Sequence, residues 1–360
     1  MELLLNDQQI LLRDAAAKLG AARGGPRRAR LLRDSKREID TEAWAEIVDA
    51  GWLSALVSEA HDGLGLGLYD LALALEETGK QVLMTPLIET AAATWALSET
   101  ASGAALAEGK RVIPAITVPG QAYSGQATGL RFEAGALSGT VPFVAFAAQA
   151  DAFLVTAGAG DTAVLCLVPR DAAGLSMTAT VHVDGSTSSA LGFAGVKVTA
   201  DGVVARGAAA AAIAGKLQDM LVLGTAAELL GVAEAATALT LDYIKLRQQF
   251  GKQIGSFQAL QHRIVNCYVD AELNRSLLYN VLSAWDAGTS HPAMIAAAKA
   301  RIGRGALQAV RVALQMHGAI GYTDEHDIGI FYKRAVALAA KYGNEITQTG
   351  RFSELTQSSH

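Results

Sequence analysis

The sequence predicts a mainly α-helical protein with a central β domain: an N-terminal helical domain, a small β-barrel or sandwich, and a C-terminal four-helix bundle. Two observations predict this order. Short runs rich in Val, Ile and Phe, separated by Gly, Asp and Pro, are confined to the middle of the chain, as is typical of a small β domain. The flanking regions have long periods without such breaks, which indicates helices. We therefore expect domains at residues 1–110, 111–207 and 208–360.

The N-terminal domain is expected to contain helices over residues 7–19, 42–50, 71–78 and 86–98. Asn6 is a favoured capping residue for the first helix, and Thr41 is expected to cap the second. Pro86 opens the fourth, at a position where a missing N–H costs nothing. Glycines within residues 58–65 predict a loop between the second and third helices.

The middle domain is expected to contain strands over residues 112–118, 139–146, 151–157, 162–168 and 196–199. The C-terminal domain is expected to contain helices over residues 213–248, 257–287, 292–317 and 324–340. Most of these helices are far longer than the usual mean of about eleven or twelve residues, and four of them indicate a bundle. Small residues at Gly224, Ala227, Gly231 and Ala235 would let neighbouring helices approach closely.

Composition excludes several classes of function. The chain of 360 residues is 51% hydrophobic, enough for a sizeable core, and its net charge of −5 gives no reason to expect nucleic acid. The arginines between Arg23 and Arg33 are balanced by nearby acids and are expected to be a solvated surface. Cys166 and Cys267 lie in apolar runs, so we expect buried free thiols and no disulfide.

The sequence also bears on location and metals. The N-terminus lacks a basic region followed by an apolar core, so it does not resemble a signal peptide, and no uninterrupted apolar run of 18 residues suggests a membrane span. We therefore expect a cytoplasmic protein. His317 and His326 flank a turn without cysteines or carboxylates at metal-ligand spacing, so we interpret them as local caps and expect no metal site.

Two stretches carry the functional signal. Residues 243–261 read YIKLRQQFGKQIGSFQALQ, and residues 315–322 read QMHGAIGY. Arg247 stands near the end of the first predicted long helix, and the guanidinium fork of arginine is well suited to a pyrophosphate because it donates two parallel hydrogen bonds. Gly251 and Gly318 interrupt the chain where a backbone could approach a flat or phosphorylated ligand closely.

These stretches resemble the C-terminal domain of the acyl-CoA dehydrogenase family, whose patterns there are roughly Y-x-x-x-R-x-Q-F-G-x-x-I-x-x-F-Q-x-x-Q and Q-x-x-G-G-x-G-Y. The first pattern is matched at nine positions from Tyr243 to Gln261, and the second at four, with Ala319 in place of one glycine. The resemblance covers nearly the whole chain and is strong after about residue 220. It implies the helical, β and helical-bundle order expected above.

The resemblance also implies an activity and a cofactor. The family oxidises an acyl-CoA thioester between its α and β carbons and passes a hydride to FAD, with electron-transfer flavoprotein as the acceptor of an active enzyme. It shares each FAD across a subunit interface, which implies a homo- or hetero-oligomer, a dimer or a tetramer. Residues expected to contact the FAD of a neighbouring subunit are Arg247, Gln249, Phe250, Ile254, Phe257 and Gln258. Those expected along its adenosine–pyrophosphate part are Gln315, Met316 and Gly318.

The chain departs from the family at the catalytic base. The family's Glu, in a Y-E-G-T segment, corresponds to Tyr342, and its other placement, after the motif arginine, corresponds to Gln248. Neither side chain has the basicity that removal of the α proton needs. Glu345 is the nearest carboxylate and, three residues along a helical turn, would share a face with Tyr342. It is our candidate base; the alternative is a solvated Glu near the chain end.

Three further positions differ from the family. Residues 119–125 replace its T-E-x-x-x-G-S-D loop, which holds flavin and thioester. Its aromatic-x-Thr pair beside the flavin ring falls near Phe143 and Ala145, so the aromatic is kept and the hydroxyl is lost. Val222 stands where the family usually carries an arginine near the acyl-CoA mouth.

Three hypotheses therefore stay open. The first hypothesis is that the chain is an FAD-dependent acyl-CoA dehydrogenase with an unconventional base. Alternatively, it is a degenerate subunit of a heteromeric dehydrogenase and lends Arg247 and its neighbours to an FAD seated on a homologous chain; some heteromeric members act on steroid side-chain thioesters. The third hypothesis is a flavin or acyl-CoA binding protein that performs no dehydrogenation, or an enzyme of the same fold with another reaction.

Overall fold

The computed structural model describes residues 5–98, 110–116 and 129–357, and the chain divides into two compact units. One unit comprises residues 1–36, 68–84 and 222–360, and the other comprises residues 37–67 and 85–221. Each unit combines segments that are distant in the sequence, because helices of the N-terminal third pack against partners much later in the chain. The domain boundaries expected near residues 110 and 207 stay predictions.

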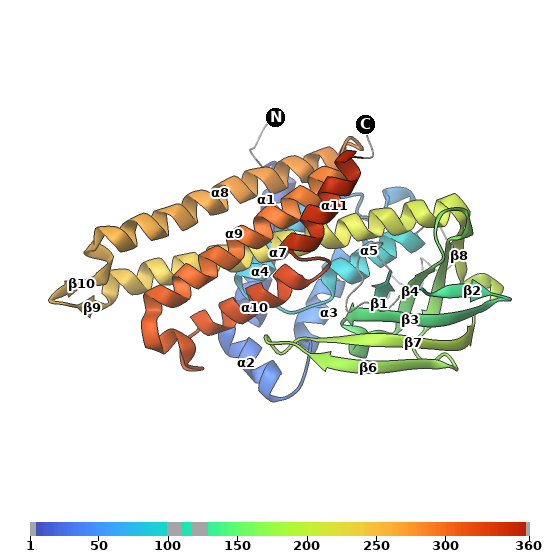
Figure 1. Ribbon diagram of the computed structural model, residues 1–360, viewed down its shortest axis with the longest axis horizontal. Helices are drawn as coiled ribbons and strands as arrows, with labels where there is room; N and C mark the ends of the chain where they lie inside the picture. Colours follow the sequence, from blue (N-terminus) through green and yellow to red (C-terminus); the bar gives the residue numbers. More distant parts are fainter. Residues whose placement is uncertain (1–4, 99–109, 117–128, 358–360) are drawn as a thin grey trace. The chain divides into compact units, whose positions relative to one another are not determined.

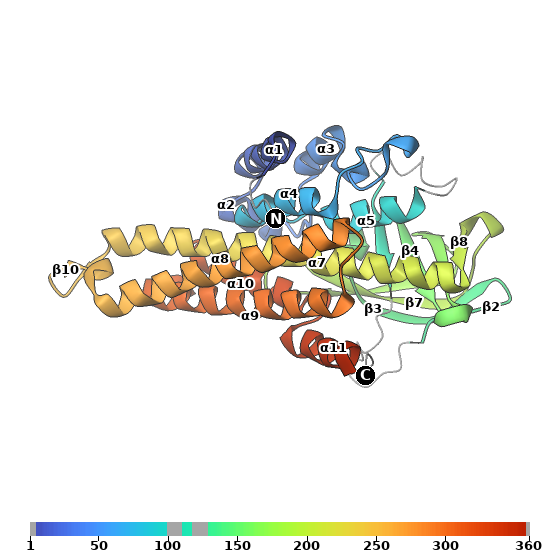
Figure 2. The same ribbon diagram turned by 90° about the horizontal axis from the view of Figure 1, so that it is seen from above.

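The helical unit is built on long helices that run alongside one another (Figures 1 and 2). Its helices are α1 (Asp7–Arg23), α2 (Pro26–Asp34), α4 (Leu68–Lys80), α8 (Gln258–Asp286), α9 (Pro292–His317), α10 (Ile328–Ala340) and α11 (Glu345–Gln357), with most of α7 (Gly207–Leu246). Helices α8, α10 and α11 all pack on α9. The four long predicted helices are confirmed, whereas α2 and α11 were not predicted.

Two predicted caps had different outcomes. Asn6 caps α1 as expected, since its side chain accepts the N–H of Gln9. Thr41 was the wrong cap for α3 (Thr41–Asp49): the carboxylate of Asp40 accepts the N–H groups of Glu42 and Ala43 instead. Asp40 lies one residue earlier in an extended conformation, from which a short acidic side chain reaches the amides two and three residues ahead.

Helices α4 and α7 are in backbone contact. A Cβ added to Gly231 would lie 2.0 Å from the carbonyl oxygen of Glu76, and one added to Gly79 would lie 2.2 Å from that of Glu228. Real Cβ atoms do not approach so closely, so only glycine fits at either position. The close helix approach expected from the small residues of α7 is therefore confirmed at Gly231.

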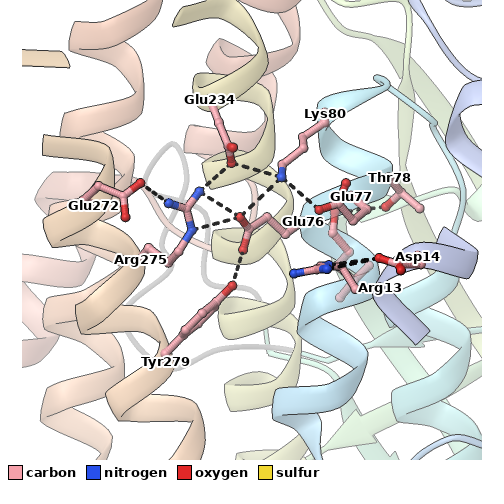
Figure 3. Close-up of polar contacts among 11 residues, drawn as sticks. Arg13, Asp14, Glu76, Glu77, Thr78, Lys80, Glu234, Glu272, Arg275 and Tyr279 are labelled. Atoms are coloured by element: carbon pink, nitrogen blue, oxygen red, sulfur yellow. Dashed lines mark hydrogen bonds and ion pairs between the residues drawn. The ribbon is translucent and has the colours of Figure 1, made fainter. Parts of the chain in front are cut away.

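A buried network of charges joins α4, α7 and α8 (Figure 3). The guanidinium group of Arg275 donates to Glu76 over 3.1 Å and also to Glu234 and Glu272, and the hydroxyl of Tyr279 donates to the second oxygen of Glu76 over 3.0 Å. Burial raises the pKa of Glu76, while Arg275 opposes that shift. The buried carboxylate is thus retained by partners from another helix.

The other unit contains two four-stranded sheets, in the orders β1-β4-β5-β8 and β2-β3-β7-β6 (Figure 1). Their strands are β1 (Val112–Ala115), β2 (Arg131–Glu133), β3 (Ala136–Ala145), β4 (Ala152–Ala157), β5 (Val164–Pro169), β6 (Leu175–Val181), β7 (Thr187–Lys197) and β8 (Val203–Arg206). Strands β1 and β4 are parallel, and the other pairs are antiparallel. Side chains of both sheets, among them Leu137 and Phe153, form one core. The central β domain is confirmed, although β2, β6 and β8 were not predicted.

Helices α3 and α5 (Leu87–Leu97) belong to the same unit, where α5 packs on β1. Helix α7 also begins here. By length and composition α7 is the one helix among the described residues that could cross a membrane, but 83% of its most apolar window is buried within the protein. A helix in the core of a protein has a similar length and apolar composition, and it is buried in this way.

Candidate flavin site

The first functional stretch forms a hairpin at the end of two long helices. After α7 ends at Leu246, β9 (Gln248–Gln249) and β10 (Lys252–Gln253) pair in antiparallel fashion, and η7 (Ile254–Ser256) leads into α8 (Figure 1). Phe250 and Gly251, at the tip, both have positive φ, 56° and 78°. A two-residue turn with two positive φ values suits the twist of a hairpin, but phenylalanine is strained there. Strain of this kind often marks a functional position.

The hairpin presents charge and aromatic surface to the outside. Phe250 is 90% exposed. Arg247 is also exposed, and within the described part of the chain its guanidinium has no hydrogen-bonding or ion-pairing partner. Phe257 is half-buried, with its ring 6.2 Å from that of Phe250 and the Lys252 ammonium 4.3 Å above its centre. An unpaired fork-shaped donor three residues before an exposed aromatic ring would fit the pyrophosphate and flat ring of a dinucleotide.

The structure brings the second functional stretch to the same end of the bundle. Met316, near the end of α9, is buried with Ile244 of α7 and Ile264 of α8, and Ile254 packs on this cluster. Gln315 and Gln258 are exposed. Of the residues expected to bind FAD, Met316 and Ile254 thus also hold the two stretches together.

The glycine after α9 is required by its backbone conformation. Gly318 has φ 65° and ψ −143°, a region that is essentially closed to other residues. A Cβ at this position would meet nothing within 4 Å, so the backbone here is open to a ligand. The expected use of Gly318 as an approach point agrees with this geometry.

Three aromatic side chains cluster beside the second stretch, an arrangement that the sequence did not reveal. The ring of His317 lies 4.3 Å from that of Tyr243 and 4.4 Å from that of His326, measured between centroids. His326 accepts the N–H of Ile328 over 3.2 Å, and so it acts as a local cap as expected. His317 instead bonds the carbonyl of Ala313 within its own helix. In the sequence, both histidines lie close to the turn that begins at Gly318, and this proximity was a signal for their contact.

Glu345, the candidate base, lies apart from the FAD-tail residues. It begins α11, its side chain is 49% exposed, and its nearest charged partner is Arg304, at 4.0 Å. Arg304 precedes His317 by 13 positions on α9, which corresponds to about 20 Å along a helix. The structure therefore does not gather Glu345 with Arg247. This separation fits the expectation that a chain's FAD-tail residues serve a neighbour's cofactor.

The base position itself is an ordered turn. Tyr342 has φ 56° and Gly343 has φ 102°. The side-chain amide of the buried Gln348 donates to the carbonyl of Tyr342 over 2.7 Å. Among the described residues, Tyr342 is thus one of four aromatic residues with positive φ; the others are Phe143, Phe146 and Phe250.

In the β unit, Phe143 lies at an irregularity of β3 where the pairing with β7 shifts between Val141 and Val144. It has φ 54° and is 50% exposed, so the aromatic expected near the flavin ring is held in a strained, accessible conformation. Ala145 pairs with Ser188 of β7. The departure at residues 119–125 lies outside the described residues.

The cysteines and the candidate metal ligands are dispersed in the described part of the chain. Both cysteines are buried free thiols, as predicted, and burial raises the pKa of Cys166 to about 11. No group of three or more His, Cys, Asp or Glu side chains is placed to hold a metal in the part of the chain that the structure describes.

Comparisons with known proteins agree with this geometry. Residues 6–107 match the N-terminal domain model of acyl-CoA dehydrogenases, and residues 213–352 match the C-terminal domain model. The chain is 29% identical to acyl-CoA dehydrogenase IpdE2 of Mycolicibacterium smegmatis, over 94% of this chain and 96% of that protein. It is 31% identical to acyl-CoA dehydrogenase FadE28 of Mycobacterium tuberculosis, over 68% and 73%. The solved structure of the Tcur3481-Tcur3483 steroid ACAD superposes with a TM-score of 0.88 at 28% identity, with 98% of each chain covered.

The helical and β architecture, together with the comparisons, defines an FAD-dependent flavoprotein of the acyl-CoA dehydrogenase type. The chain belongs to the acyl-CoA dehydrogenase family.

Proposed function

We propose that this chain acts within an oligomer that oxidises an acyl-CoA thioester between its α and β carbons, and that it lends its hairpin to the FAD of a neighbouring subunit. The observation that carries the proposal is the exposed, unpaired guanidinium of Arg247 three residues before the 90% exposed Phe250, which lies at the tip of the hairpin. A charge and an aromatic ring left open in this way are best explained by a ligand or partner that covers both.

The residues of this chain have separate tasks in that proposal. Arg247 would donate to the pyrophosphate, and the open backbone at Gly318 would lie along the adenosine. Polar groups of the cofactor would form hydrogen bonds with three exposed amide side chains, those of Gln249, Gln258 and Gln315. When bound, FAD supplies the acceptor for the hydride of the β carbon. Electron-transfer flavoprotein would receive the electrons from an active enzyme, and the cytoplasm is the proposed location.

An exposed apolar face on α8 supports the oligomer. Val265, Tyr268, Val269 and Leu273 are 55%, 62%, 49% and 59% exposed, and their spacing of three and four places them along one side of the helix. The side begins next to the hairpin that carries Phe250. A second subunit on this face would therefore also reach the flavin-binding residues.

Glu345 is the proposed base if this chain performs the chemistry itself. Its carboxylate is accessible and lies three residues after Tyr342, at the turn where the base is expected. Glu345→Gln keeps the shape of the side chain and removes its basicity. In that case the variant should lose reduction of the flavin by an acyl-CoA and retain flavin binding. Glu354→Gln, in the same helix, is the matched control.

A second candidate function is favoured by the absence of a carboxylate at Tyr342 and Gln248. The chain would then be the partner subunit of a heteromer, in which a homologous chain carries the base. The solved steroid ACAD to which this chain is similar is named for two chains. We propose steroid side-chain or fatty acyl thioesters as the substrate class on that ground.

Purification separates these possibilities. We would express the chain alone and with a homologue from a neighbouring gene, record the flavin spectrum, and add an acyl-CoA. If the chain purified alone is yellow and an acyl-CoA bleaches it, and if the Glu345→Gln variant is not bleached, the result supports a self-sufficient enzyme. Flavin and bleaching that appear only with the homologue support the partner subunit. In either assembly, Arg247→Met should weaken FAD binding by about tenfold to a hundredfold, the usual worth of a hydrogen bond to a charged group. Unchanged affinity would refute the proposed grip.

A further inference from the structure

Two histidines beside the flavin-binding stretch are held in defined neutral forms. His317 Nδ1 lies 2.8 Å from the carbonyl oxygen of Ala313. A carbonyl only accepts, so Nδ1 carries the proton, and in the neutral ring Nε2 is a lone pair. His326 Nδ1 accepts the N–H of Ile328. An amide only donates, so in His326 the lone pair is on Nδ1 and the proton is on Nε2.

Protonation of either ring would conflict with its surroundings. On His326 the added proton would sit on Nδ1 and face the N–H of Ile328, whose nitrogen is 3.2 Å away, so the cap of α10 would be lost. On His317 it would sit on Nε2, which is buried and has no hydrogen-bond partner among the described residues. His317 as a whole is only 4% exposed, so water cannot readily solvate the new charge.

The charged and titratable groups around the pair do not offset this cost. Tyr243 of α7 stacks on His317, and its hydroxyl donates to the His317 carbonyl over 3.4 Å. Asp327 favours a charged His326, but it is paired over 2.6 Å with Arg30 of α2, which opposes it. Burial lowers the pKa of both histidines, and the effect of His326 on His317 is in the same direction.

The pair is directly joined to the flavin-binding stretch. His317 lies between Met316 and Gly318, and its ring contacts those of Tyr243 and His326, which also contact each other edge to face at 5.8 Å between centroids. Movement of this ring would therefore shift the backbone at Gly318, which is open to the ligand.

We propose that His317 and His326, as a pair of neutral rings in contact, are positioning residues that hold residues 315–318 for flavin, and that flavin binding weakens when the pair takes up a proton. The inference rests on the proposed function, since it takes residues 315–318 as part of the FAD site. The sign follows from the same contacts: a proton on the folded pair disturbs the arrangement that binds flavin, so FAD-bound protein takes up that proton less readily than FAD-free protein. FAD affinity therefore falls as pH falls through the titration of the folded pair, which burial moves below the ordinary histidine pKa of about 6.5.

The test is the pH dependence of FAD affinity in the assembled oligomer, measured by quenching of flavin fluorescence between roughly pH 5 and pH 7.5, a range that extends below the ordinary pKa of histidine because burial lowers the pKa of both rings. The wild-type protein should bind FAD about tenfold more weakly at the acid end, which corresponds to about one pKa unit of linkage. In His326→Asn the amide oxygen can accept the Ile328 N–H at any pH, so the dependence should shrink to that of His317 alone. His317→Phe with His326→Asn, which keeps a stacking ring and cannot titrate, should be flat. The control His61→Asn removes an exposed histidine and should keep the wild-type slope.

A second measurement follows the histidine pair in the absence of flavin. Hydrogen exchange at the Ile328 amide, corrected for the intrinsic effect of pH, should lose protection in acid in the wild type and not in His326→Asn. Tight flavin binding with no pH dependence, or a wild-type slope in the double variant, would overturn this inference alone. An oligomer that binds no FAD at neutral pH would overturn both this inference and the proposed function. A simple packing role would lower stability in the variants without flattening the pH profile.

Discussion

Lys299 of α9 caps the C-terminus of α10: its Nζ atom donates to the carbonyl oxygen of Leu338 over 2.9 Å and to that of Ala339 over 3.4 Å. Lys299 is only 1% exposed. The last carbonyls of a helix lack partners within the helix, and a lysine from a neighbouring helix supplies them here. The turn at Tyr342, which occupies the family's base position, follows directly.

This lysine makes stability depend on pH above neutrality. Burial lowers the pKa of Lys299 from 10.5 to about 7, with Lys341 adding to the shift and Glu228 opposing it. Between these values the unfolded chain holds a proton that the folded chain lacks, so the free energy of unfolding rises with pH through this window and is unaffected by this group below it. Lys299→Met removes this dependence. The stability advantage of the wild type over the variant should grow by about 2 kcal/mol between pH 7 and pH 9.

Urea unfolding at the two pH values measures that difference. Lys18→Met, on the exposed side of α1, is the control and should unfold in parallel with the wild type. A Lys299→Met variant whose unfolding follows the wild-type pH dependence would show that Lys299 does not titrate in this window.

The contact of α4 with α7 predicts that two glycine-to-alanine substitutions have opposite effects on stability. Gly231→Ala places a methyl group 2.0 Å from the carbonyl oxygen of Glu76, so the helices must separate, and we expect a loss of about 3 kcal/mol or more. Gly303→Ala, in α9, meets nothing within 4 Å and should gain about 0.5–1 kcal/mol from helix propensity. Thermal unfolding followed by circular dichroism checks both. Equal effects would contradict the close contact.

The buried charge network predicts a large cost for removing one partner. Arg275→Met leaves Glu76 buried without its guanidinium and should destabilise the protein by about 3–5 kcal/mol. The loss should be smaller in acid, because burial already raises the pKa of Glu76 and a protonated carboxyl needs no cation. Glu76→Gln in the same chain should recover part of the loss. Arg301→Met, which removes a pair that is 40% exposed at the arginine, should cost under about 1 kcal/mol.

The strained tip of the hairpin predicts a trade between stability and flavin binding. Phe250→Asn gives the Asn-Gly pair that two positive φ values favour, so the flavin-free chain should gain up to about 1 kcal/mol. The exposed ring is lost at the same time, so the FAD dissociation constant should rise about tenfold. Urea unfolding and a flavin titration of one preparation measure the two effects. Unchanged flavin affinity would mean that Phe250 is exposed for another reason.

Much of the helical framework followed from local pattern. The 292–317 helix was predicted at its observed bounds, because Pro292 and Gly318 are strong start and stop signals. Helix α10 begins at Ile328, four residues later than expected, because the chain first makes a turn that His326 caps. The sequence pattern of α2 indicates a solvated surface of arginines. Its arginines in fact pair across the chain, Arg30 with Asp327 and Arg33 with Asp324, and no local periodicity reports such partners.

The candidate site shows the same division. The spacing of Arg247, Phe250 and Gly318 identified the family and its cofactor, because these residue types are chosen for local chemistry and backbone conformation. The contacts of His317 with Tyr243 and His326, and the separation of Glu345 from Arg247, depend on how helices pack. Such contacts join residues from different helices, and their geometry is set by side-chain volume and shared burial. By itself, therefore, the sequence determined the long helices, the central β domain and the kind of ligand, while the tertiary structure decided which titratable groups meet.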